Sequence, residues 1–200
     1  MTTSEIHNIC GKYKIENYTI NDYMSISVEG DVNLTYKNLK SLPIKFKEVS
    51  GYFSCHNNQL TSLEYCPETV SGYFFCGHNQ LTSLEGCPGT VGGDFFCNNN
   101  QLTSLEYCPE TVGGHFYCDN NQITNFDGLP EFFERQINLY RNPVYEIYKL
   151  FNQDPRCIYW IREFGAIQGD EVVRDRLEEV YYTLGMDIPK DIELKKYILV

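Results

Sequence analysis

Long apolar runs are absent from this 200-residue sequence. None reaches the roughly 18 residues that a membrane-spanning helix needs. The first ten residues, MTTSEIHNIC, also lack the basic segment and apolar core of a signal peptide. We therefore expect a cytoplasmic protein that does not bind membranes.

Lysine and arginine are absent between Lys47 and Arg135, and the net charge of the chain is −11. A nucleic-acid partner needs the opposite field, so nucleic acid is excluded as a partner. Acidic side chains recur in the same stretch at one spacing: Glu64, Glu85, Glu106 and Asp127. Two interpretations remain open for them, a solvated edge or a field that steers a basic partner.

Catalytic and metal-binding motifs are absent as well. The sequence has no G-x-S-x-G, P-loop or H-E-x-x-H motif, and no C-x-x-C pair with zinc spacing. His56, His78 and His115 do not pair with Asp94 or Asp119 in any repeated arrangement. We expect no enzyme, no metal and no cofactor.

Nine cysteines are present, and seven of them recur at a spacing of 21 residues. The two columns are Cys55, Cys76, Cys97, Cys118 and Cys66, Cys87, Cys108. Leucine replaces cysteine at the ends of both columns, at Leu34, Leu129 and Leu139. A place that accepts either residue is a buried apolar place, so we expect reduced core thiols.

The stretch from Ser50 to Pro130 repeats one pattern four times with a period of 21 residues. A representative copy is GDFFCNNNQLTSLEYCPETVG. Such a period indicates a solenoid, because one unit cannot bury its apolar side alone and must stack on its neighbours. Degenerate copies extend the pattern in both directions. We therefore expect six coils within residues 30–144.

One column of the repeat is asparagine: Asn58, Asn79, Asn100, Asn121 and Asn142. A carboxamide offers two donors and an acceptor, which suits the backbone groups of an adjacent coil. We expect these side chains to form a buried ladder. Lys37 holds the matching place of the first coil, which is therefore expected to be open on one side.

The rest of each coil predicts a return path without regular helix. Proline recurs there, at Pro67, Pro88, Pro109 and Pro130, so extended or 3₁₀ turns are expected on the outer side. Core filling is assigned to Val49, Val70, Val91, Val112 and Phe133. A glycine column predicts positive φ or close approach of the next coil, at Gly30, Gly51, Gly72, Gly93 and Gly114.

The candidate binding face follows from strand alternation. If the column starting at Phe53 points inward with the cysteines, the residues between them point outward. The predicted site is Tyr52, Tyr73, Phe75, Asp94, Phe96, His115, Tyr117, Asp119, Asn138 and Tyr140. Phe75, Phe96 and Tyr117 form its exposed aromatic ladder. Alternatively, the stacked aromatics only stiffen the sheet, and a register error of one residue would exchange ladder and core.

Both ends of the chain depart from the repeat. Residues 1–29 alternate around Asn21-Asp22, which predicts a β-hairpin cap. Residues 145–200 predict a helical cap, with helix starts at Pro143, Pro155 and Asp170 and a stop at Gly185. The alternative for this segment is a second interaction surface formed by Trp160 and Tyr181.

The repeat resembles the leucine-rich repeat family, whose signature is L-x-x-L-x-L-x-x-N/C-x-L. The matching places in one copy are Phe74, Cys76, Asn79 and Leu81, so phenylalanine and cysteine stand where leucines are usual. The resemblance implies an α/β solenoid with a parallel sheet on its inner face. Phage and bacterial proteins with short repeats of this kind are similar in pattern.

That resemblance implies a function in protein binding. We expect a non-enzymatic module whose inner strand face binds a host protein, with a basic surface as its complement. The alternative is a glycan-binding or adhesive module, because aromatic faces with asparagine and aspartate also suit sugars.

Overall fold

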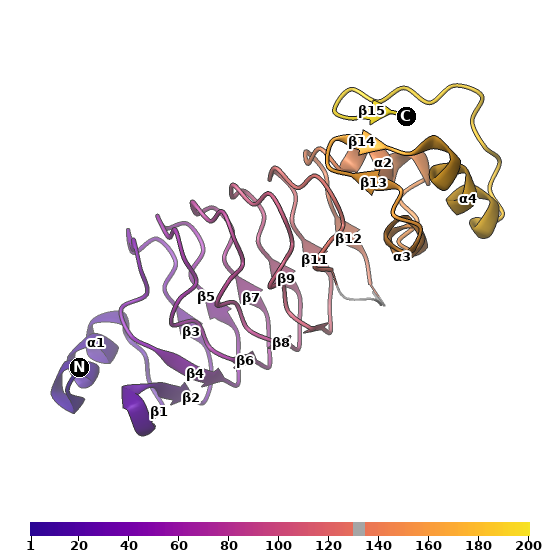
Figure 1. Cartoon of the computed structure of the whole chain (residues 1–200). Coiled ribbons are helices and arrows are strands. Elements are labelled where there is room, and N and C mark those ends of the chain that lie inside the picture. The colour runs from indigo at the N-terminus through magenta and orange to yellow at the C-terminus, as the bar shows by residue number, and fades with distance from the viewer. Residues whose placement is uncertain (130–134) are drawn as a thin grey trace.

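The computed structural model describes residues 1–129 and 135–200 and shows an elongated β-solenoid with 21-residue turns (Figure 1). Five steps of 21 residues separate the first rung, at Val32, from the last, at Ile137. The six predicted coils thus correspond to six rungs that enclose about five turns. Helices lie at both ends of the solenoid.

A parallel sheet lines one side of the solenoid, as the sequence predicts. Its neighbouring strands pair in register at the repeat period, so that Phe74 lies opposite Phe95 and Phe75 opposite Phe96. Its strands, in chain order, are β3 (Val32–Asn33), β5 (Phe53–Ser54), β7 (Phe74–Phe75), β9 (Phe95–Phe96), β11 (Phe116–Tyr117) and β12 (Ile137–Asn138).

A second parallel sheet occupies the return path, where only extended or 3₁₀ turns were expected. Its strands within the turns are β4 (Phe46–Val49), β6 (Thr69–Val70), β8 (Thr90–Val91) and β10 (Thr111–Val112). The described part of the turns contains little helix. The α/β class implied by the leucine-rich repeat resemblance is therefore replaced by a β-solenoid with parallel sheets on two sides.

The N-terminal cap consists of a helix and a hairpin. Strands β1 (Tyr18–Ile20) and β2 (Ile26–Val28) pair antiparallel around the predicted turn, with the 3₁₀ segment η1 (Asp22–Met24) between them. Helix α1 (Thr3–Tyr13) was not predicted. Its capping box, formed by Thr2 and Glu5, is a readable start signal, and Ile6 is buried against the core.

The C-terminal segment forms three helices and a small sheet. The helices are α2 (Tyr145–Leu150), α3 (Arg156–Glu163) and α4 (Arg174–Leu184), and the strands are β13 (Ile167–Gln168), β14 (Glu171–Val172) and β15 (Ile198–Leu199). After α4 the chain passes around the helices and returns to β15 (Figure 1). Within the described residues, no helix is both long and apolar enough to cross a membrane.

Details of the predicted helical cap need correction. Helix α2 begins at Tyr145, two residues after Pro143, and Asp170 caps no helix because a strand, β14, follows it. Gly185 does end α4, with a φ of 67°. Tyr181 is buried, and its hydroxyl donates to the Leu150 carbonyl, so it cannot contribute to a second interaction surface.

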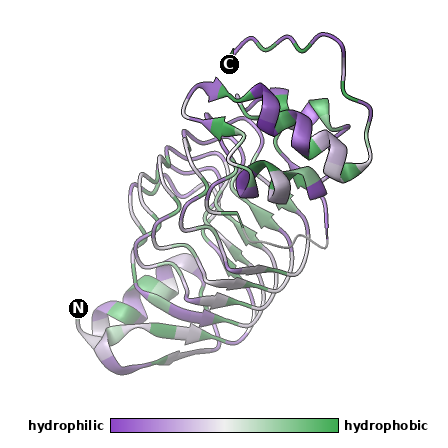
Figure 2. Cartoon of the chain, turned by 45° about the vertical axis from the view of Figure 1, so that its right-hand side comes forward, coloured by the Kyte–Doolittle hydropathy of each residue, from purple (hydrophilic) through white to green (hydrophobic). Residues whose placement is uncertain are grey.

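The core of the solenoid is filled by the predicted inward columns. Phe53, Phe74 and Phe95 are buried and stack with ring centroids 5.7 and 5.6 Å apart. Apolar residues accordingly recur from turn to turn along the solenoid (Figure 2). Val112 is only half-buried, and Phe133 and Pro130 lie outside the described residues.

The cysteines contribute to this core as free thiols. All nine lie in the described segments, and none forms a disulfide. Burial raises the pKa of the Cys97 and Cys118 thiols well above the ordinary value. Cys87 and Cys108 are half-buried, and their Sγ atoms lie 2.8 and 3.0 Å from the carbonyl oxygens of Tyr107 and Gly128.

The asparagine ladder joins each coil to the one before it. The Asn100 amide donates to the Cys97 carbonyl in its own coil at 3.0 Å and to the Cys76 carbonyl in the preceding coil at 3.1 Å. Its Oδ1 accepts from the Leu81 N–H at 3.1 Å. Asn58 makes the same contacts with Leu34, Leu39 and Cys55, and its Oδ1 also accepts from the Lys37 N–H at 3.0 Å.

The glycines of this column allow the backbones of neighbouring coils to approach each other closely. A Cβ on Gly72 would lie 2.8 Å from the Gly51 carbonyl carbon, which no side chain tolerates. In this column only Gly30 has a positive φ. Left-handed backbone recurs in two other columns of the repeat: Tyr36, Asn57, His78, Asn99, Asn120 and Arg141, and Tyr65, Gly86, Tyr107 and Gly128.

Replacing Asn100 by alanine should lower the free energy of unfolding by about 1–3 kcal/mol, because buried backbone groups of two coils lose their partners. The measurement is urea unfolding followed by circular dichroism. Gln101→Ala is the matched control, since Gln101 is exposed. An unfolding midpoint equal to that of the control would show that the ladder is dispensable.

Thiol titration tests the cysteine columns. Burial raises the pKa of Cys108 to about 12, so the reactive thiolate is scarce at pH 8 even at this half-buried place. We expect slow labelling of the folded protein and nine reactive thiols in denaturant without reductant. Two or more missing thiols in the unfolded protein would reveal disulfides.

Candidate functional site

The candidate site lies on the outward side of the first sheet, which consists of β3, β5, β7, β9, β11 and β12 and is called here the β3–β12 sheet. Strand alternation places Phe74 in the core and Phe75 on the outside, so the predicted register is confirmed. The outward column at the centre of this face is Asn33, Ser54, Phe75, Phe96, Tyr117 and Asn138.

Three rings in this column form a continuous stack, called here the aromatic stack. Phe75 and Phe96 have centroids 4.6 Å apart and planes 15° apart, and Phe96 and Tyr117 are 4.5 Å and 4° apart. The rings were expected to be exposed but are half-buried, because each covers the face of the next. Both faces of Phe96 are therefore occupied, and the stack presents ring edges to solvent.

A hollow of about 580 Å³ lies at the Ser54 end of the aromatic stack and is called here the first hollow. Its lining comes from β3, β5, β7 and β9 and the residues just before or after them: Asn33, Thr35, Tyr52, Ser54, His56, Tyr73, Phe75, Phe96 and Asn98. This lining contains no lysine, arginine, aspartate or glutamate, and its one histidine is His56. The Thr35 and Ser54 hydroxyls are hydrogen-bonded at 2.7 Å.

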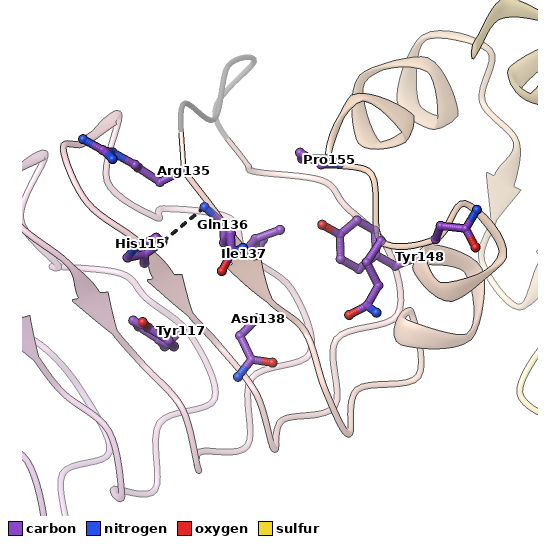
Figure 3. A pocket seen from close by; sticks show the side chains of 10 residues that line it. His115, Tyr117, Arg135, Gln136, Ile137, Asn138, Tyr148 and Pro155 are labelled. Atoms are coloured by element: carbon purple, nitrogen blue, oxygen red, sulfur yellow. Dashed lines mark hydrogen bonds between the residues drawn. The ribbon is translucent and has the colours of Figure 1, made fainter. Parts of the chain in front are cut away.

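A second hollow, of about 830 Å³, lies at the opposite end of the stack, between the last rungs and the helices (Figure 3). The solenoid side contributes His115, Tyr117, Arg135, Gln136, Ile137 and Asn138, and the helical side contributes Tyr148, Asn152, Gln153 and Pro155. The Gln136 N–H donates to Nδ1 of His115 at 3.3 Å. This contribution of the C-terminal segment was not predicted, and no repeat pattern in the sequence signals it.

The acidic residues of the face are engaged in backbone and amide hydrogen bonds. Asp94 Oδ1 accepts from the His115 N–H at 2.7 Å, and Asp31 Oδ1 accepts from the Tyr52 N–H at 2.9 Å. The Asp119 carboxylate accepts from the Asn138 amide at 3.1 Å. The side chains are thus held in fixed positions while their negative charge remains on the face.

His56 contributes a neutral ring to the first hollow. Burial, and secondarily the nearby His78, lower the pKa of His56 below its ordinary value. The two ring centroids are 5.1 Å apart at an interplanar angle of 89°. At neutral pH this wall of the hollow is therefore uncharged.

The ten predicted site residues divide into three groups. Four line the first hollow: Tyr52, Tyr73, Phe75 and Phe96. Three line the second: His115, Tyr117 and Asn138. Three line neither: Asp94, Asp119 and Tyr140. Tyr140 is exposed and packs edge-on against Tyr145 at 5.6 Å.

The described residues form no recognisable metal site, and comparison with known proteins identifies no family for the chain. Within residues 1–129 and 135–200, no group of three or more His, Cys, Asp or Glu side chains is arranged to hold a metal ion. No family model, curated protein or solved structure matches the chain.

Replacing His78 by asparagine should raise the pKa of His56 toward, but not up to, the ordinary value, because burial remains when the neighbouring charge is removed. Asparagine suits the left-handed backbone at this place, as at Asn57 and Asn99. The measurement is an NMR titration of the His56 ring. A lowered pKa also means that the unfolded chain binds this proton more readily, so stability falls as the pH drops through the ordinary histidine range.

A His56 pKa that does not move in the His78→Asn protein would show that the two rings are not coupled.

Proposed function

We propose that this chain is a non-enzymatic protein-binding module that binds its partner with the outward face of the β3–β12 sheet. The observation that carries the proposal is the aromatic stack, which is continuous over three rungs and opens into a hollow at each end. Aromatic residues at the centre of a surface are characteristic anchors of protein interfaces.

The dimensions of the face suit a protein partner. Neighbouring strands lie about 4.8 Å apart, so the six rungs extend over roughly 24 Å. A standard interface covers about 800 Å² on each partner, so a contact of this length would be roughly 33 Å wide and would include the turns beside the strands. Exposed tyrosines, Tyr73 and Tyr140, extend the apolar area at its edges.

The charge distribution favours a basic partner. Asp31, Asp94 and Asp119 lie on this face, and no lysine or arginine occurs between Lys47 and Arg135. Such a field speeds association with a partner of opposite charge and rejects nucleic acid. The association rate should accordingly fall as salt concentration rises.

The stack geometry favours protein over glycan. Sugars stack on open ring faces, whereas the central ring, Phe96, has both faces covered by its neighbours. A glycan-binding or adhesive module remains the second candidate, because Phe75 shares the first hollow with the polar side chains of Asn33 and Asn98.

We include in the proposal a kinship with leucine-rich repeat proteins of phages and bacteria, and hence a host protein as the partner. The asparagine column supports this kinship, since it occupies the asparagine place of that signature and bonds neighbouring coils. The second sheet in the return path is a departure from the α/β form of that family.

The double substitution Phe96→Ser and Tyr117→Asn should weaken partner binding at least about tenfold, because it removes two anchors. Both replacements occur naturally in the same outward column, at Ser54 and Asn138, so the fold should tolerate them. The measurement is affinity capture from a bacterial lysate, followed by binding assays with the captured protein.

Tyr107→Ala is the matched control, because Tyr107 is an exposed tyrosine outside the aromatic stack. Binding that survives the double substitution in a folded protein would remove the proposed site from this face. A glycan array that is positive while lysate capture is empty would favour the second candidate.

A further inference from the structure

The first hollow lies where the aromatic stack lacks its next ring. Strand pairing puts Ser54 directly opposite Phe75, just as Phe75 lies opposite Phe96. A fourth ring in register would therefore stand above Ser54. The chain has a small hydroxyl there, and the hollow of about 580 Å³ includes both Ser54 and Phe75 in its lining.

The outer face of Phe75 is not covered by another stacked ring. Tyr52 approaches Phe75 with centroids 6.3 Å apart and planes at 80°, and Tyr73 approaches at 6.1 Å and 46°. Neither arrangement reproduces the 4.6 Å, near-parallel contact on the other side of Phe75. Both tyrosines line the hollow.

The floor of the hollow is fixed. The Ser54 hydroxyl is hydrogen-bonded to that of Thr35, and Ser54 is only 6% exposed. The Asn33 side chain accepts from the Thr35 N–H at 3.0 Å, which holds that strand end in place. A planar ring could enter beside Phe75 without displacing a charged or mobile group.

Two carboxylates lie along one side of the hollow. Along the outward column that starts each strand, the residues on successive rungs are Asp31, Tyr52, Tyr73 and Asp94. The two tyrosines are therefore flanked by a carboxylate on either side. His56, which is neutral at neutral pH, adds no opposing charge.

We infer that the first hollow binds an aromatic side chain of the partner protein, flanked by an arginine or lysine, and that this ring completes the aromatic stack over Ser54. The inference rests on the proposed function and specifies what the face recognises. Parallel stacking on Phe75 provides the ring contact, and Asp31 or Asp94 provides the charge contact with the adjacent basic residue.

The test uses short peptides as probes and the full chain as receptor. Two-dimensional amide NMR is recorded during titration with N-acetyl-Arg-Trp-amide, N-acetyl-Arg-Leu-amide and N-acetyl-Glu-Trp-amide. The Arg-Trp probe should shift the amides of Asn33, Ser54 and Asn98 and bind at least about threefold more tightly than either of the others. Equal binding of the Arg-Leu probe would overturn the inference.

Filling the hollow from within provides the decisive variant. Ser54→Phe supplies the missing ring, so it should preserve or raise the thermal midpoint and weaken Arg-Trp binding at least about tenfold. Tyr107→Ala, at an exposed tyrosine outside the aromatic stack and both hollows, is the control and should bind the Arg-Trp probe normally.

If Ser54→Phe does not fold, Phe75→Leu provides the same test. It retains apolar volume but removes the ring face, so the preference for Arg-Trp over Arg-Leu should disappear. Undiminished Arg-Trp binding in a folded Ser54→Phe protein would overturn the inference. So would shifts at Ser54 caused by methyl β-glucopyranoside when the Arg-Trp probe causes none.

Failure of the aromatic-pocket inference and failure of the proposed function would give different experimental results. A captured partner whose binding depends on Phe96 and Tyr117 but not on Ser54→Phe would leave the proposed function intact and reject the aromatic pocket. Arg-Trp binding at the hollow without any captured protein would support the pocket and reject the wider interface.

Discussion

The whole structure depends on the hydrogen bonds that fasten each 21-residue coil to the one before it. A coil of this length is too short to bury its own apolar side, so its stability comes from its neighbours. Backbone pairing in two parallel sheets supplies part of that attachment, and the asparagine ladder supplies it where the chain turns between them. Because each attachment repeats at one period, the side chains above it also align in columns. The aromatic stack is a consequence of that alignment.

Much of this was predictable because repetition reveals which places are equivalent. The strand register followed from the alternation of Phe74 and Phe75, and the buried thiols followed from columns that accept cysteine or leucine. The second sheet was missed because two-residue strands such as Thr69–Val70 carry no periodic signal of their own. Helix α1 was missed although Thr2 and Glu5 form a capping box, and β14 displaced the expected cap at Asp170.

The candidate site was only partly predictable. The sequence places Phe75, Phe96 and Tyr117 in one outward column, but not their stacking distance, which depends on the rotamers that neighbouring rungs impose on one another. The first hollow depends on a ring that is missing from the stack, and the second depends on side chains from the C-terminal segment. Ser54 is an interruption in a column, and Tyr148 reaches the face from a segment outside the repeat.

The identical register of successive rungs also makes the length of this protein adjustable. Since Phe74 pairs with Phe95 as Phe95 pairs with Phe116, removing or duplicating one 21-residue unit joins equivalent strand ends and leaves every hydrogen-bonded column in phase. Unequal recombination between the nearly identical copies would perform that operation in a single genetic event. The length of the sheet would thus change by one strand spacing at a time while both end caps stay the same.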